Sequence, residues 1–198
     1  DLVRSRGLGD VYKRQLLYGD EMSDEKVMIF IDGSNFYHNL KTHNFNTHID
    51  FKKFSDLLCR GRKHIRTYYY NAPVKQADDR EEYRKQQLFF DGLRRTPYLE
   101  LKLGYFLKKT KICEECGHVL NYPVEKGCDV NLAVDIMSMA YKGLYDVAIL
   151  VSSDGDFSSA CQCVKDLGKH VENAYFQQAS SWHLLNVCDV RILIDQDL

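Results

Sequence analysis

Hydrophobic and polar positions along the chain follow two alternating patterns. Continuous apolar runs at positions 27–31 (VMIFI) and 147–151 (VAILV) are typical of strands that are buried on both faces. Runs that alternate in polarity, or that are rich in β-branched and aromatic residues, predict further strands at 65–70, 99–106, 171–176 and 190–194.

Between these runs, apolar residues spaced three or four apart predict helices at 78–95, 129–141, 157–167 and 181–187. In the second of these helices we expect the buried stripe to consist of Val130, Val134, Met137 and Tyr141. Because strand and helix patterns alternate almost throughout, we predict an α/β fold with a mainly parallel central sheet and helices on both faces.

The length of 198 residues fits one domain, which we place at 22–198 with a Cys- and Lys-containing insert at about 107–125. We expect this insert to be irregular. Residues 1–21 mix charges with glycine and show no clear period. We therefore expect them to be a disordered leader or a non-native addition ahead of Met22.

Three properties of the whole sequence bear on where the protein is located and on what it can bind. No apolar stretch approaches the roughly 18 residues of a membrane span and no signal peptide is evident, so we expect no membrane contact. Seven cysteines, an odd number in a domain large enough to fold without disulfides, favour the reducing cytoplasm. Since the net charge is −1, any contact with nucleic acid has to come from a local basic surface.

Acidic residues follow both of the fully apolar strands. Asp32 comes directly after the first, and Asp154 and Asp156 come shortly after the other. If these strands are neighbours in a parallel sheet, the three carboxylates meet at one edge, where ligands bind in such folds. They would repel one another unless a cation lay between them, and their hard oxygen ligands suit Mg²⁺ or Mn²⁺.

Asp129 is a fourth candidate, at the predicted start of the helix 129–141. Asp135 lies six residues later, roughly 120° away around the helix, so we favour Asp129 as the metal ligand. Each acid also has a structural explanation, since Asp-Gly pairs form turns and aspartates cap helices. A group of four on one predicted edge favours a metal site.

Three segments resemble the NYN domain, a PIN-like nuclease fold, and within it the LabA-like group. They are 27–37 (VMIFIDGSNFY), 125–135 (EKGCDVNLAVD) and 150–157 (LVSSDGDF), which stand in the family's order. The resemblance implies a Rossmann-like, three-layer architecture with about five or six strands. It also implies metal-dependent cleavage of RNA, with Asp32, Asp129, Asp154 and Asp156 as catalytic and metal-binding residues.

Three further residues are candidates for substrate binding. The resemblance places Asn35 beside the first acid, where its amide would orient a metal-bound water or a phosphate. Ser153 is positioned to hydrogen-bond a carboxylate or a phosphate, and Lys126 belongs to a group of lysines around the insert that could hold phosphates. The alternative for these lysines is a solvated charged surface.

A ribonuclease is thus the leading hypothesis, since hydrolysis of a phosphodiester needs no protein nucleophile when metal ions are bound. The alternative is a non-catalytic RNA-binding or scaffold module of the same fold. A haloacid-dehalogenase phosphatase would have Asp-x-Asp where Asp32-Gly33-Ser34 stands, and a Toprim domain would have a glutamate after its first strand. Both are therefore disfavoured.

The insert contains Cys113-x-x-Cys116-Gly-His118, which resembles half of a zinc knuckle. A structural zinc ion takes four protein ligands, so Cys128 and His118 are the candidates to complete a Zn²⁺ site with this pair. Two alternatives remain open. The cysteines are free thiols in a hairpin, or the site is completed across a homodimer.

Overall fold

The computed structural model describes residues 24–74 and 79–195, so the leader predicted for 1–21 lies outside the described residues. Its central sheet contains β1 (Lys26–Asp32), β2 (Lys63–Asn71), β3 (Leu99–Leu103), β6 (Val147–Val151), β7 (His170–Phe176) and β8 (Val190–Ile194). The six strands stand in the order β3-β2-β1-β6-β7-β8, and every neighbouring pair is parallel. The predicted parallel sheet of five or six strands is confirmed.

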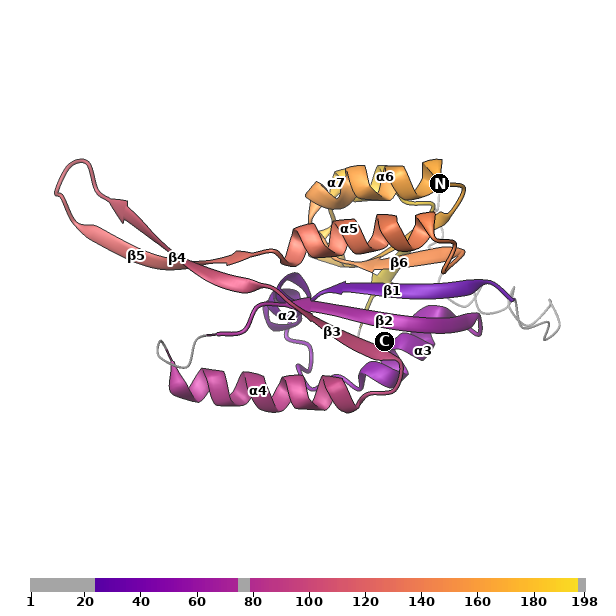
Figure 1. Cartoon of the computed structure of the whole chain (residues 1–198), viewed down its shortest axis with the longest axis horizontal. Coiled ribbons are helices and arrows are strands. Elements are labelled where there is room, and N and C mark those ends of the chain that lie inside the picture. Colours follow the sequence, from indigo (N-terminus) through magenta and orange to yellow (C-terminus); the bar gives the residue numbers. More distant parts are fainter. Residues whose placement is uncertain (1–23, 75–78, 196–198) are drawn as a thin grey trace, which may run out of the picture.

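Helices cover both faces of this sheet, which gives the predicted three layers (Figure 1). One face carries α2 (Gly33–Thr42), α3 (Phe51–Cys59) and α4 (Arg80–Arg95), and the other carries α5 (Cys128–Tyr141), α6 (Ser158–Asp166) and α7 (Trp182–Val187). Two short 3-10 turns are η1 (Gly155–Phe157) and η2 (Gln177–Ala179). The sequence patterns did not predict α2 or α3. Within the described ranges, no helix is long and apolar enough to span a membrane.

Strands β1 and β6 lie at the centre of the sheet, and both of their faces are buried. Val27, Ile29 and Ile31 pack in the core under α2–α4, whereas Met28 and Phe30 pack in the core under α5–α7. This two-sided burial explains their continuous apolar sequences. From β1 the chain runs outward through β2 to β3 and then returns to β6, so the strand order reverses between β1 and β6.

The insert forms a two-stranded antiparallel hairpin of β4 (Tyr105–Ile112) and β5 (Val119–Lys126), which we call the arm. The arm extends away from the body of the molecule (Figure 1). The expectation that 107–125 is irregular is therefore wrong. Because most arm side chains are exposed on both faces, the arm lacks the alternation of hydrophobicity that marks a half-buried strand.

Helix α5 buries a different stripe from the one predicted. Its buried residues are Cys128, Leu132, Ile136 and Ala140. By contrast, Val130, Val134 and Tyr141 are 66%, 52% and 81% exposed. Two apolar stripes exist on this helix at helical spacing, and periodicity alone does not say which one faces the sheet.

Candidate functional site

Asp32 stands where β1 ends and α2 begins, and hydrogen bonds hold both of its carboxylate oxygens. Its Oδ1 accepts from the backbone N–H of Asn35 (3.1 Å), so Asp32 caps α2. Its Oδ2 accepts from the Ser152 hydroxyl (3.1 Å). This second bond ties the end of β1 to the loop after β6, so the carboxylate does more than cap a helix.

The glycine after Asp32 is required by the close approach of β2. A Cβ atom on Gly33 would lie 2.4 Å from the Tyr70 carbonyl oxygen and 2.4 Å from the Tyr69 ring. Real Cβ atoms essentially never come within 3.0 Å of such neighbours. Gly33 therefore lets α2 begin directly against the sheet and keeps Asp32 at its edge.

The loop after β6 is fastened to the start of α2 by a chain of hydrogen bonds. The Asn35 side-chain oxygen accepts from the Ser153 backbone N–H (3.0 Å), and the Ser152 hydroxyl oxygen accepts from the Asp154 N–H (3.1 Å). Asp154 Oδ1 in turn accepts from the Asp156 N–H (3.0 Å), which caps η1. The two acid-bearing turns meet at one edge of the sheet, as neighbouring parallel strands require.

Two further acids reach this edge from α5 and the arm. Asp129 is in the first turn of α5, and Glu125 is near the end of β5. The Ser34 hydroxyl donates to Glu125 Oε2 (2.5 Å), which places that carboxylate beside the first turn of α2. Sequence reasoning missed Glu125 as a site residue, although it opens the EKG segment. Asp135, the other acid of α5, accepts a hydrogen bond from the Tyr70 hydroxyl (3.0 Å).

Five carboxylates make up what we call the acidic edge: Asp32, Glu125, Asp129, Asp154 and Asp156. Burial raises the pKa of Asp32 to about 6, and the charges of Asp129 and Glu125 add to the rise. Burial also raises the pKa of Asp129, and the charges of the three other nearby acids raise it further. The positive charge of Lys126 acts in the opposite direction. Negative charge is therefore only partly compensated here.

The chemistry of the acidic edge fits a hard divalent cation. Carboxylate oxygens are preferred ligands of Mg²⁺ and Mn²⁺, and a cation would offset the repulsion that raises both pKa values. In the part of the chain that the structure describes, no three His, Cys, Asp or Glu side chains form a ready-made metal site. Mg²⁺ usually keeps several waters and is bound through one or two carboxylates, so a site for it does not require three side chains around the ion.

The three predicted substrate-binding residues lie in different surroundings. The Ser153 hydroxyl oxygen is buried and has no hydrogen-bond partner among the described residues. Asn35 uses its side-chain oxygen to join the two loops. Lys126 ends β5 with an exposed side chain whose charge acts on Asp129. Of the three, Lys126 presents its polar group to solvent beside the acids.

An exposed aromatic side chain that sequence reasoning missed lies near the loop of Asp154. Gly155 in this loop approaches Ser181 and His183 so closely that an added Cβ would be 2.9 Å from the Ser181 hydroxyl oxygen. The start of α7 therefore adjoins the loop. Trp182, between these two residues, is 72% exposed.

The four residues predicted to share a zinc ion are divided between the two ends of the arm. Cys113, Cys116 and His118 lie at its tip, whereas Cys128 follows its base and is buried at the start of α5. Paired strands of eight residues separate the two locations by roughly 23 Å at about 3.3 Å per residue. One ion cannot contact all four residues, so the predicted set is wrong.

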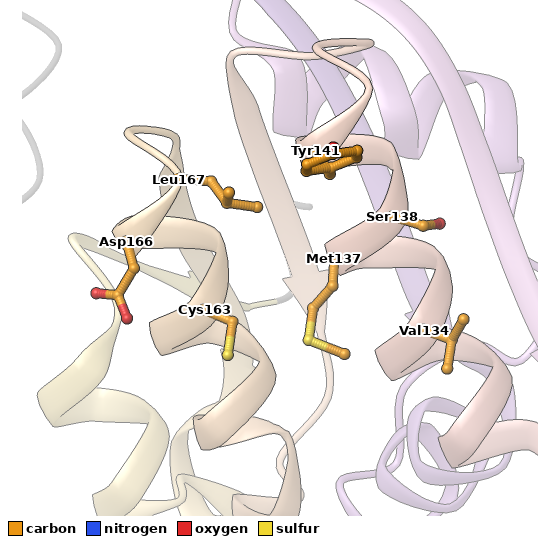
Figure 2. A pocket seen from close by; sticks show the side chains of 7 residues that line it. All are labelled: Val134, Met137, Ser138, Tyr141, Cys163, Asp166 and Leu167. Carbon is orange, nitrogen blue, oxygen red and sulfur yellow. The ribbon is translucent and has the colours of Figure 1, made fainter.

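An open, mostly apolar pocket of about 500 Å³ lies between α5 and α6 (Figure 2). Its lining residues are Val134, Met137, Ser138, Tyr141, Cys163, Asp166 and Leu167. They extend from the middle of each helix to its C-terminal end, whereas the acidic edge lies near the N-terminal ends. This pocket offers a single carboxylate, so we place the candidate site at the acidic edge.

Comparisons with known proteins agree with this architecture. The chain resembles the solved structure of a protein of unknown function, VPA0982 from Vibrio parahaemolyticus, with 23% identity and a TM-score of 0.65 over 91% of this chain and 99% of that chain. A proposed oxidoreductase from Parabacteroides merdae has 14% identity and a TM-score of 0.34, over 86% of this chain and 31% of its own, and is too distant to support an argument. No protein with a curated description matches the sequence.

At this identity the similarity to the Vibrio protein shows the fold alone. The family comparison reaches further, because the NYN domain matches residues 26–195, which include all six strands of the sheet, the arm and the acidic edge. The chain therefore belongs to the NYN domain family and has its PIN-like nuclease fold.

Proposed function

We propose that this protein is a ribonuclease that hydrolyses RNA phosphodiester bonds at the acidic edge with Mg²⁺ or Mn²⁺, and that it falls in the LabA-like group of its family. The observation that carries the proposal is the meeting of five carboxylates where the strand order reverses. Ligands bind at this point in open parallel sheets. Membership of a family with a nuclease-like fold supports the same reading.

In this proposal the cation lies among the carboxylates of Asp32, Asp129 and Asp154, one or two of which contact it directly, and the exposed Asp156 contacts its waters. A bound divalent cation would lower the pKa of a water and stabilise the charge on the leaving oxygen. Asp32 is oriented in advance by its two hydrogen bonds, so little reorganisation is needed when substrate binds. Asp129, which is exposed in the first turn of α5, is our candidate to take a proton from the attacking water.

One face of the arm suits single-stranded RNA. Directly opposite residues in an antiparallel pair lie on the same face. One face of the arm therefore carries the pairs Tyr105–Lys126, Leu107–Val124, Lys109–Tyr122 and Lys111–Leu120. This face has lysines for phosphates and tyrosines on which bases can stack, and it has no carboxylate. Since Lys126 lies next to Asp129, a strand bound there would lead to the acidic edge.

The second candidate is a non-catalytic RNA-binding or scaffold module of the same fold. The lysines and tyrosines on one face of the arm favour it, because they could bind RNA whether or not the acidic edge cleaves it. Five carboxylates near a polyanion argue against it, because they would weaken RNA binding unless a cation offset their charge.

Cleavage of labelled single-stranded and structured RNAs tests the proposal, with wild type and Asp154→Asn compared in Mn²⁺, Mg²⁺ or EDTA. We expect EDTA to abolish cleavage and the substitution to lower its rate by roughly 100-fold or more. Asn keeps an oxygen that can accept from the Asp156 N–H, so the turn should survive while the charge is lost. RNA binding without cleavage by the wild type would favour the binding module. Cleavage that resists both EDTA and the substitution would contradict the proposed site.

A further inference from the structure

The tip of the arm carries two exposed cysteines in a turn that is shaped like a metal-binding knuckle. The Cys113 N–H donates to the His118 carbonyl (2.9 Å), and the Gly117 N–H donates to the Cys113 carbonyl (2.9 Å). Hydrogen bonding by the backbone N–H groups of Cys116 and Glu115, and by the Cys116 thiol, lowers the pKa of the Cys113 thiol. Gly117 has a φ of 68°, a conformation that favours glycine. The backbone thus closes residues 113–118 into a tight turn that carries both cysteines at the tip of the arm.

A single chain supplies too few ligands for this site. Structural zinc is bound tetrahedrally by four Cys or His ligands, often with a Cys-x-x-Cys pair as half of the set. In residues 24–74 and 79–195, no third Cys, His, Asp or Glu is gathered with Cys113 and Cys116. Cys128, the other thiol considered, is at the far end of the arm. The two cysteines therefore form half of a site.

The position of the tip allows a second copy of the chain to supply the other half. The arm extends well away from the body, so two tips can meet without contact between the bodies (Figure 1). Ile112 and Val119, a directly opposite pair next to the knuckle, are each more than half exposed, and a second tip would cover them. An isolated two-stranded hairpin is only marginally stable in water, so a cross-link at the tip would also order the arm.

We propose that two copies of this chain join at the tips of their arms and share one zinc ion, which is bound by Cys113 and Cys116 of each copy. The ion then has four thiolate ligands, and each thiol releases its proton to solvent when it binds. The arrangement is a two-fold symmetric dimer in which the same surface of both copies forms the contact. This inference does not depend on whether the acidic edge cleaves RNA.

Zinc content and mass of the full chain test the proposal. The metal-free protein, kept reduced, would be titrated with Zn²⁺ and examined by metal analysis and by sedimentation. We expect one zinc ion for every two chains and a mass twice the 23.1 kDa of one chain, both reversed by EDTA. Cys113→Ser should bind no zinc and stay monomeric. Cys163→Ser, which also changes an exposed thiol, should behave as wild type.

Three results would overturn the proposal: one zinc ion per monomer, no zinc binding by the wild type, or a dimer that persists in Cys113→Ser. Misfolding of the variant is separated from loss of the site by its thermal unfolding, which should match that of the metal-free wild type because Cys113 is exposed at the tip. Co²⁺ gives an independent readout. Tetrahedral thiolate ligation gives it intense visible absorption, and we expect this signal at half an equivalent of metal per chain.

Discussion

At the scale of single residues, Asp32 is a carboxyl group whose ionisation destabilises the folded protein. Burial raises its pKa from 3.8 to about 6, so the folded protein binds a proton there more tightly than the unfolded chain does. The protonated Asp32 side chain therefore makes its full contribution to stability below about pH 4, and this contribution is lost as the pH rises through about 6. At neutral pH this leaves a cost to the folded state of roughly 3 kcal/mol.

Asp32→Asn should remove this cost, because a neutral side chain needs no desolvation of charge. We expect the variant to have a higher free energy of unfolding than wild type at pH 7.5 without divalent cations, by up to about 3 kcal/mol. The difference should be about half as large at pH 5. Urea unfolding at the two pH values measures it. A variant that is less stable than wild type, or equally shifted at both values, would count against the buried charge.

The residues that sequence could place at the site are those that directly follow a buried strand or open a helix. Asp32, Asp154 and Asp156 follow the two fully apolar strands, whose ends must share an edge if the strands are parallel neighbours. Glu125 could not be placed this way. It comes from the arm, whose pairing is non-local and whose exposed side chains show no period, and its contact with Ser34 spans 91 positions.

At the scale of elements, the joint between β1 and α2 depends on Gly33. An alanine there would put a Cβ atom against the Tyr70 carbonyl oxygen, which belongs to the backbone of a central strand and cannot move aside cheaply. We expect Gly33→Ala to lower the free energy of unfolding by about 1–3 kcal/mol. Chemical denaturation with near-UV circular dichroism measures the change.

Gly92 provides the matched control, since an added Cβ in this helix would meet nothing within 4 Å. Gly92→Ala should raise the free energy of unfolding by about 0.5–1 kcal/mol, because alanine is the better helix former. Equal shifts in the two variants would mean that the close approach of β2 does not constrain Gly33.

The elements also show where periodicity stops being informative. Helix α5 has residues at helical spacing on two sides, and only the tertiary arrangement shows that Leu132 and Ile136 face the sheet while Val130 and Val134 face solvent. The β-propensity of the arm is likewise weak as a signal, because neither of its faces is buried. In a strand that is buried on both faces almost every position is apolar, so there is no need to decide which face is buried. The strands β1 and β6 were therefore predicted correctly.

At the scale of the whole molecule, alternation of strand and helix was sufficient to predict a parallel sheet in three layers. Parallel strands need crossover connections, and these connections place helices on both faces. The reversal of strand order between β1 and β6 then brings two loops together at one edge. The arm does not follow from these rules. It is an addition to the layered body, and it brings Glu125 and Lys126 to the edge that the body forms.

The central claim is that the acidic edge carries out metal-dependent cleavage of RNA, and a pair of substitutions on α5 tests it most directly. Asp129 faces the acidic edge, whereas Asp135 of the same helix accepts a hydrogen bond from Tyr70. The measurement is the rate of cleavage of a labelled RNA in Mn²⁺ by wild type, Asp129→Asn and Asp135→Asn. We predict a loss of roughly 100-fold for Asp129→Asn and a rate close to wild type for Asp135→Asn. Cleavage that Asp129→Asn leaves intact, or that both substitutions reduce equally, would contradict the account.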